Sequence, residues 1–310
     1  MKRCPIYLLV TDLDNTLYDW VSTFVPALYA MVDVAAGILG VDREQLLEDL
    51  KTVHQRYHNS EQPFALLDTP AVEHRYPNTS RLERKRHLDP AFEAFNNARR
   101  ENLRLYPEVR ETLQVIRDSG CVIVGYTEAF VENSLYRLTL LGILDQIQLL
   151  YVPKSRSDEG HPDPARRRIL DEYRDRVRLL PDGHRKPDPQ VLREICEEHQ
   201  VSPKETLYVG DSMTRDVAMA KKAGVHAAWA RYGCAFSRED WNKLVRVSHW
   251  TAEDVAREVW LKEEYRDVRA DVEIDSYAEL LGPVEKNANE FFDFSSKDES
   301  VRGAPEAVVR

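Results

Sequence analysis

VTDLDNTLYDW, residues 10–20, follows directly on an apolar run at residues 6–10. Short apolar runs bounded by polar residues are typical of buried strands. Asp12 and Asp14 therefore stand one residue apart at the point where a strand is expected to end. Such a pair is either an ordinary polar turn or part of a site built around negative charge.

The overall composition limits the partners of the protein. The 310 residues are 43% hydrophobic, enough for a sizeable core, and the formal net charge is −10. This acidity argues against nucleic acid as a partner, because duplex binding needs clustered lysine and arginine. The four cysteines have no C-x-x-C spacing and indicate a reducing cytoplasm. We find no stretch that predicts a signal peptide or a membrane span, and nothing that indicates an oligomeric state.

Strand and helix patterns alternate along most of the chain. Buried strands are expected at residues 6–10, 122–126, 148–152 and 207–209, with a short one at 271–274. Helices are expected between them, at residues 107–118, 189–199 and 215–223. This alternation predicts an α/β fold, a Rossmann-like parallel sheet covered by helices on both faces.

Residues 19–104 break the alternation, because they contain only helical patterns, at 20–39, 42–58 and 80–104. We therefore expect an all-helical cap at 19–104, inserted into a discontinuous core of residues 1–18 and 105–283. The charged segment 153–183 is expected to be a surface excursion. Residues 237–267 are expected to add helices to the core, and the polar segment 284–310 to be a flexible tail.

Reactive side chains follow three of the expected strands. Asp12 and Asp14 follow the first strand, Thr127 the second and Asp211 the third, with Asp216 five residues further on. Ligands of open α/β sheets bind at the carboxyl ends of the strands, so these groups are expected to converge.

Lys186, in the stretch RKPDP at residues 185–189, precedes a helix that begins with proline. Several carboxylates in one pocket would repel each other, and a hard divalent cation with oxygen ligands, such as Mg²⁺, would relieve the repulsion. A metal, a lysine and a threonine hydroxyl together make a phosphate site.

These motifs resemble those of the haloacid dehalogenase superfamily, mainly its phosphatases. The likeness lies in DLDNTL at 12–17, Thr127, Lys186 in RKPDP, and GDSMTRD at 210–216, in the order of the family. LYPEVRETLQVIRDSG at 105–120 and DVEIDSYAELL at 271–281 are similar to further family segments. The resemblance covers residues 1–18 and 105–283, but neither 153–183 nor the tail.

The resemblance implies a role for each residue. Asp12 is the nucleophile that forms an aspartyl-phosphate, and Asp14 is the general acid and then the general base. Thr127 and Lys186 bind the phosphoryl group. The implied ligands of Mg²⁺ are Asp12, the Asp14 backbone carbonyl and Asp211, with Asp216 acting through water or behind the ligands. Since the dehalogenases lack an aspartate at the position of Asp14, its presence favours phosphate esters.

The implied function is Mg²⁺-dependent hydrolysis of a small phosphorylated metabolite. DLDNTLY resembles nucleotide- and flavin-mononucleotide-directed members, while phosphoglycolate and sugar phosphates stay open. A phosphomutase would share all four motifs, and a ligand-sensing or scaffold protein would share the fold.

Glu128 differs from the family pattern, because many members have asparagine or a small residue at this position. His54 and His58 have the i, i+4 spacing of metal ligands but no third ligand, so we expect them to be structural.

Overall fold

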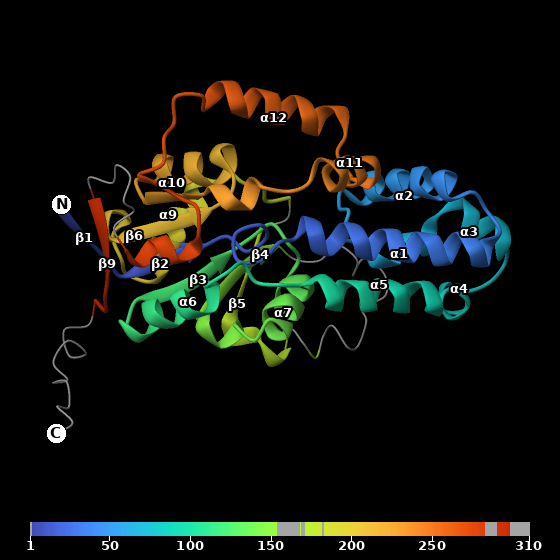
Figure 1. The fold of residues 1–310 in the computed structure, drawn as a ribbon, viewed down its shortest axis with the longest axis horizontal. Helices are drawn as coiled ribbons and strands as arrows, with labels where there is room; N and C mark the ends of the chain where they lie inside the picture. The colour runs from blue at the N-terminus through green and yellow to red at the C-terminus, as the bar shows by residue number, and fades with distance from the viewer. Residues whose placement is uncertain (1, 154–167, 169–170, 182, 283–289, 298–310) are drawn as a thin grey trace. The chain divides into compact units, whose positions relative to one another are not determined.

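The computed structural model describes residues 2–153, 168, 171–181, 183–282 and 290–297. The chain divides into two compact units (Figure 1). The core unit consists of Met1–Tyr18, Leu105–Ala235 and Glu264–Arg310. The helical unit consists of Asp19–Arg104 and Phe236–Glu263.

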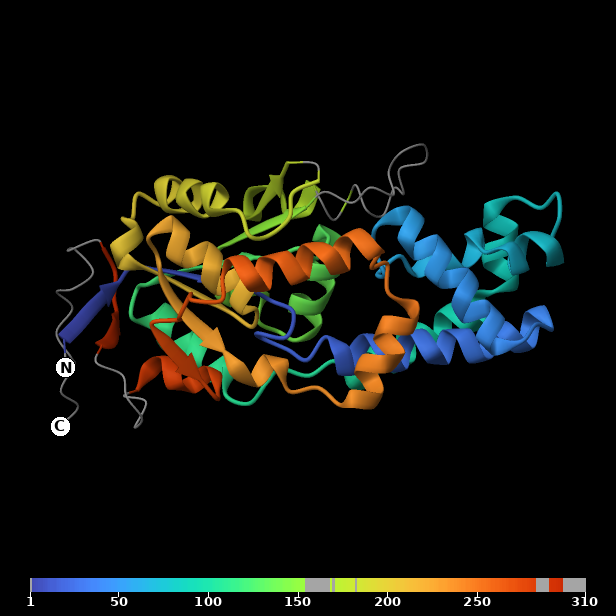
Figure 2. The same ribbon diagram turned by 90° about the horizontal axis from the view of Figure 1, so that it is seen from above.

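The core unit is built on a seven-stranded sheet in the order β5-β4-β3-β2-β6-β7-β8, in which every neighbouring pair is parallel (Figure 1, Figure 2). The predicted Rossmann-like parallel sheet is confirmed. The strands are β2 Leu8–Thr11, β3 Val122–Tyr126, β4 Leu149–Pro153, β5 Val177–Leu180, β6 Thr206–Gly210, β7 His226–Ala230 and β8 Val272–Ile274.

Helices cover the sheet because parallel neighbours need a crossover connection. Leu192 of α9 and Met219 of α10 pack on one face, against a cluster that includes Val10 and Tyr208. α6 and α7 lie on the other side of the sheet and pack against β3 and β4 (Figure 1). In the described residues of this unit, the regular helices are α6 Val109–Asp118, α7 Val131–Leu140, α9 Pro189–Glu198 and α10 Ala218–Ala223, with the π-helix η6 at Met213–Val217. Short 3₁₀ turns occur at Leu144–Gln146, Arg174–Arg176, Pro203–Glu205, Arg231–Cys234 and Tyr277–Leu281.

Two strands of the sheet were not predicted. β7 is short and rich in alanine, and β5 lies within the supposed surface excursion at 153–183. That prediction was wrong for residues 177–180, because β5 extends the sheet beside β4 as an edge strand and needs little apolar surface of its own. Residues 154–167, 169 and 170 of the excursion lie outside the described residues.

The first predicted strand is two strands. β2 joins the main sheet, whereas β1 Lys2–Ile6 pairs in parallel with β9 Glu290–Phe294 in a separate two-stranded sheet. The flexible tail predicted from residue 284 is therefore wrong for 290–294. The polar composition of residues 284–310 as a whole concealed the short stretch EFFDF, whose three phenylalanines favour a strand. Residues 284–289 and 298–310 lie outside the described part of the chain.

The helical unit contains only helices and turns in its described residues, all of 19–104 and 236–263. Long α1 packs against α5, and their apolar faces join those of α2 in one core. Asp42 caps α2 by accepting from the backbone N–H groups of Glu44 and Gln45, and Ser80 forms a capping box with Glu83. The helices are α1 Val21–Leu39, α2 Arg43–Tyr57, α3 Pro70–Arg75, α4 Arg81–His87, α5 Asp89–Asn102, α11 Arg238–Val247 and α12 Ala252–Glu264, with a 3₁₀ turn at Pro63–Asp68.

α1 is long and apolar enough to span a membrane by length and composition, so the prediction that no stretch of the sequence is long enough was wrong for this helix. More than half of its apolar window, 56%, is buried inside the structure. A core helix of a globular unit has the same length and composition, and Leu28 and Met31 of α1 are such core residues.

Residues 236–263 were assigned to the core unit from the sequence, but they belong to the helical unit. Leu244 and Val247 of α11 are buried in its apolar cluster. The Nδ1 atom of buried His54 lies 2.6 Å from the Val247 carbonyl oxygen, and the Tyr29 hydroxyl donates to the Lys243 carbonyl at 3.2 Å. The periodicity of residues 238–247 predicted a helix, but it did not indicate which part of the chain its apolar face packs against.

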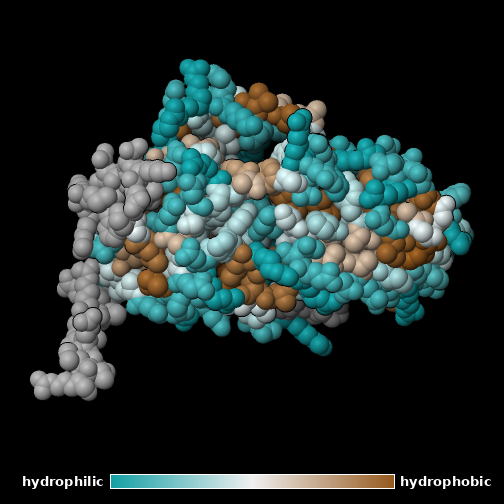
Figure 3. All heavy atoms as spheres, viewed as in Figure 1, coloured by the Kyte–Doolittle hydropathy of each residue, from teal (hydrophilic) through white to brown (hydrophobic). Residues whose placement is uncertain are grey.

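α12 differs from α11 in its exposure. Leu261 is its buried residue, while Val255, Val259 and Trp260 are exposed, and Figure 3 shows an apolar patch over this helix.

The insertion of residues 19–104 begins and ends at one place in the core unit. Tyr18, before the insertion, and Leu105, after it, form an antiparallel bridge.

Candidate active site

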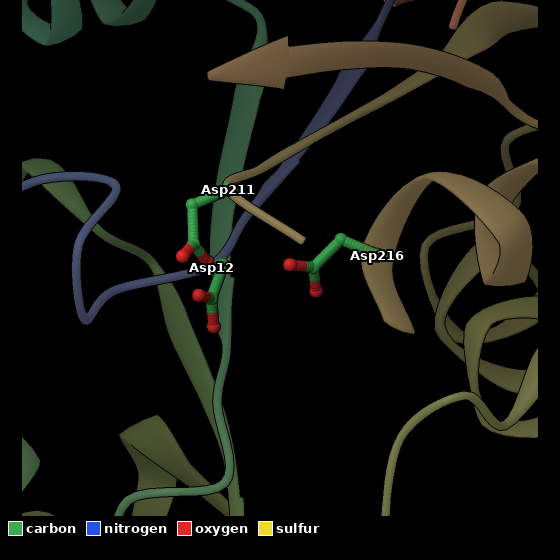
Figure 4. Close-up of side chains that lie close together, drawn as sticks. All are labelled: Asp12, Asp211 and Asp216. Carbon is green, nitrogen blue, oxygen red and sulfur yellow. The ribbon is translucent and has the colours of Figure 1, made fainter. Parts of the chain in front are cut away.

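Three carboxylates meet at the carboxyl end of the sheet. Asp12 follows β2, Asp211 follows β6, and Asp216 lies in η6 (Figure 4). β2 and β6 are hydrogen-bonded neighbours, with Thr11 opposite Val209, so their ends coincide. One carboxylate oxygen of each aspartate lies within 4.8 Å of the others. The structure thus brings together three of the predicted residues from positions about two hundred residues apart.

η6 places Asp216 in this cluster. Four residues lie between Asp211 and Asp216, and the π-helical turn over Met213–Val217 accommodates the chain there. Gly210 is needed there, because a Cβ atom at this position would lie 2.5 Å from the Asp216 carboxyl carbon. The close approach of Asp216 to the end of β6 therefore depends on a residue without a side chain.

Lys186 supplies the positive charge of the cluster. Its Nζ atom donates to Asp12 Oδ1 at 2.7 Å and to Asp216 Oδ1 at 2.9 Å. The side chain is only 3% exposed, and the two carboxylates raise the pKa of Lys186 although burial opposes them. The ammonium group is therefore charged and held in place. The following Lys186–Pro187 peptide bond is cis.

Two tyrosine rings surround the Lys186 ammonium. Nζ lies 4.9 Å from the centre of the Tyr126 ring and 5.4 Å from that of Tyr208, within the range of cation–π attraction. Nζ also donates to the Tyr208 hydroxyl at 2.7 Å, which in turn donates to Asp216 Oδ1 at 2.9 Å. Lys186 is thus fixed by rings, a hydroxyl and carboxylates together.

The carboxylates are poorly solvated. Burial raises the pKa of Asp12 well above its ordinary value, and Lys186 opposes the shift. Burial, followed by the Asp216 charge, raises the pKa of Asp211 to about 7. Both shifts follow from concentrating negative charge away from water, and a divalent cation at the cluster would favour the ionised forms.

The donor set fits a hard divalent cation, since the cluster consists of carboxylate oxygens. Both oxygens of Asp216 are engaged, Oδ1 by Lys186 and Tyr208 and Oδ2 by the Ser212 backbone N–H at 3.0 Å. This arrangement suits Asp216 to a position behind the ligands, and leaves Asp12 and Asp211 as the better candidates for direct coordination.

Thr127 follows β3, the strand beside β2, and is buried. Its Oγ1 accepts from the Ala129 backbone N–H at 3.0 Å, so its own proton can be donated elsewhere. Glu128 turns to other partners: Oε1 accepts from the Lys186 backbone N–H at 3.1 Å, and Oε2 lies 3.5 Å from Arg215 Nη1. The unusual glutamate therefore connects the Thr127 and Lys186 segments.

Asp14 lies outside the three-carboxylate cluster. Its Oδ1 accepts from Nη1 of Arg137 in α7 at 2.9 Å. The Arg137 side chain is 4% exposed, and its guanidinium carbon lies 5.8 Å from the centre of the Tyr18 ring. The two aspartates of DLDNTL thus have different environments, one beside a lysine and other carboxylates, the other paired with an arginine.

Comparison with known proteins identifies the family of the chain. A family model described as haloacid dehalogenase-like hydrolase matches residues 6–224. The chain belongs to this family. The match spans β2, the inserted helices 19–104 and the segment that carries Asp211 and Asp216.

Several curated relatives of this haloacid dehalogenase-like hydrolase are phosphatases. An N-acetylmuramic acid 6-phosphate phosphatase from Pseudomonas aeruginosa is 25% identical over 80% of this chain and 93% of its own length. A phosphoglycolate phosphatase from Vibrio vulnificus is 26% identical over 75% of this chain and 87% of its own. These relatives and the family support the predicted enzyme class, a hydrolase of phosphoric monoesters.

A solved structure shows the same fold. A 2-haloacid dehalogenase from Pseudomonas syringae pv. Tomato DC3000 superimposes with a TM-score of 0.54 and 21% identity, covering 89% of this chain and 96% of that one. At this identity the likeness concerns the arrangement of the elements, and it agrees with the Rossmann-like core.

Three residues near the predicted site of this haloacid dehalogenase-like hydrolase were not predicted from its motifs: Arg137, Tyr126 and Tyr208. In the sequence, the two tyrosines cannot be distinguished from other aromatic residues of a strand, because a strand pattern does not indicate which ring will lie beside a lysine. Arg137 could have been noticed, since it stands among apolar residues in LYRLTL at 135–140.

Proposed function

We propose that this protein is a Mg²⁺-dependent phosphatase that hydrolyses a small phosphomonoester through an aspartyl-phosphate on Asp12. The observation that carries the proposal is the buried contact of Asp12 with Lys186 inside the carboxylate cluster. A nucleophilic carboxylate, a fixed cation and oxygen ligands for a metal are what phosphoryl transfer requires.

The residues divide the reaction between them. Asp12 attacks phosphorus as the bond to the leaving oxygen breaks, and protonated Asp14 gives its proton to that oxygen. The Asp14 carboxylate then takes a proton from water as the water oxygen attacks phosphorus and the bond to Asp12 breaks. Lys186 and the Thr127 hydroxyl hold the phosphoryl oxygens. Asp12, Asp211 and the Asp14 carbonyl would hold Mg²⁺, which neutralises charge on the phosphoryl group when bound.

The relatives favour a particular substrate class. The curated relatives act on N-acetylmuramic acid 6-phosphate, phosphoglycolate and glyceraldehyde 3-phosphate, all small phosphorylated sugars or acids. We therefore rank phosphorylated sugars and sugar acids first, ahead of the nucleotides and flavin mononucleotide that DLDNTLY suggests. The helical unit is proposed to act as the cap that selects among them. All four cysteines are thiols rather than disulfides, which supports a location in the reducing cytoplasm.

A panel of phosphorylated metabolites tests the proposal. Purified protein with Mg²⁺ should release inorganic phosphate from at least one member, EDTA should stop the release, and added Mg²⁺ should restore it. Asp12→Asn should abolish turnover, because an amide is a poor nucleophile, while Asp145→Asn, at a 90% exposed side chain, should not. Release of an isomer without free phosphate would indicate a phosphomutase instead. Absence of turnover on the whole panel would exclude the enzyme hypothesis.

A further inference from the structure

Arg137 is a buried charge for which the four motifs give no role. It lies on α7, whose buried residues Val131, Leu135 and Leu138 form the apolar face of the helix. Its side chain is nonetheless 4% exposed, which is costly for an arginine unless a charged partner is present. That partner is Asp14, at 2.9 Å from Nη1. The ion pair joins α7 to the loop that carries the predicted proton donor.

The surroundings keep the Arg137 guanidinium charged. Burial lowers the pKa of Arg137, but the Asp14 carboxylate outweighs it, so that the net shift is upward. Burial, followed by Asp14, raises the pKa of the Tyr18 phenol well above its usual value. The ring below the guanidinium is therefore uncharged, and its face adds a cation–π contact.

We propose that Arg137 is a positioning residue that fixes the Asp14 carboxyl group for its proton transfers to the leaving oxygen and from water. The proposal rests on the proposed function. Arg137 occupies Oδ1 of Asp14, which restricts the rotation of the carboxyl group. A guanidinium group suits this task, because it stays protonated and does not compete for the proton. Proton transfer depends steeply on the distance between donor and acceptor, so restricting the rotation of Asp14 affects the rate.

The leaving group provides a readout that a structural defect does not. Phenyl phosphate and p-nitrophenyl phosphate have nearly the same shape, but the phenolate of the first is more basic and needs the proton of Asp14 more. The quantity to measure is kcat/KM for each, because it reports the step in which the leaving group departs. Removing Asp14, as in Asp14→Asn, should lower kcat/KM for phenyl phosphate much more than for p-nitrophenyl phosphate.

Arg137→Met should shift the ratio of the two kcat/KM values in the same direction, by about tenfold or more, within the range of a general acid. Arg137→Lys keeps the charge but not the planar fork, and should recover part of the loss. In the Asp14→Asn background, Arg137→Met should change the ratio no further, because Arg137 acts through Asp14. Arg110→Met is the matched control: Arg110 donates to the Gly142 carbonyl after α7 and should leave the ratio unchanged.

Three results would overturn the proposal. An equal loss on both substrates would give Arg137 a purely structural role. A faster reaction of phenyl phosphate with Arg137→Met would mean that the arginine restrains Asp14 away from the substrate. Additive effects in the double variant would separate the two residues. If Arg137→Met fails to fold, Arg137→Lys supports the same comparison. Failure of the wild-type protein to hydrolyse either ester would refute the proposed function itself, which is a distinct outcome.

Discussion

Replacing Lys186 by methionine should destabilise the core unit far more than the loss of an exposed ion pair. The change removes the ammonium group that contacts Asp12 at 2.7 Å and Asp216 at 2.9 Å, and leaves two buried carboxylates uncompensated. Removing one partner of a buried ion pair costs about 3–5 kcal/mol in the free energy of unfolding. Lys221→Met is the control, since its pair with Asp271 is just as short, at 2.6 Å, but the lysine is 37% exposed. That pair is worth about 0–1 kcal/mol.

Hydrogen exchange of the β2 and β6 amides measures this difference, because it reports opening of the core unit separately from the helical unit. Without divalent cations at neutral pH, these amides should exchange with an opening free energy about 3–5 kcal/mol lower in Lys186→Met and nearly unchanged in Lys221→Met. Mg²⁺ should restore part of the loss by supplying positive charge to the carboxylates. Equal effects of the two substitutions would refute the idea that the Lys186 charge holds the cluster together.

Four further predictions concern the same cluster. Because the pKa of Asp211 is raised to about 7, Mg²⁺ affinity measured by calorimetry should rise about tenfold per pH unit up to that pH, and Asp211→Asn should flatten the profile. The same shift makes the metal-free fold lose stability as pH rises from about 4 to 7, since the charged form is disfavoured in the folded state. Gly210→Ala should push Asp216 away and reduce the free energy of unfolding by about 1–3 kcal/mol, which thermal melting would show as a lower melting temperature. Gly37→Ala in α1 is the control, because the added Cβ atom meets no atom within 4 Å and should not destabilise the protein. Tyr208→Phe removes the hydroxyl between Lys186 and Asp216, so the free energy of unfolding in urea should fall by about 1–3 kcal/mol and turnover should fall as well. Tyr126→Phe is the control, because the Tyr126 hydroxyl contacts His184 instead, and it should retain more turnover.

The sequence predicted the parts of the site that strand ends determine. Asp12 and Asp211 each follow an apolar run, and parallel pairing of β2 with β6 is enough to bring them together. Lys186 was predicted from the motif RKPDP rather than from any strand. What escaped prediction depends on contacts between distant segments: β9 pairs with β1, α11 packs in the helical unit, and Arg137 meets Asp14. A local pattern reports the shape of an element and its buried face, but not the residue that will lie opposite.

The return of α11 to the helical unit affects how that unit can be engineered. The chain crosses between the units four times, near residues 18, 104, 235 and 263. If residues 19–104 alone were exchanged for those of a relative, Leu244 and Val247 of α11 would lose the apolar residues against which they pack. A functional chimaera therefore requires both segments from one parent, as a two-part graft. The same dependence would make separate variation of the two segments difficult during evolution.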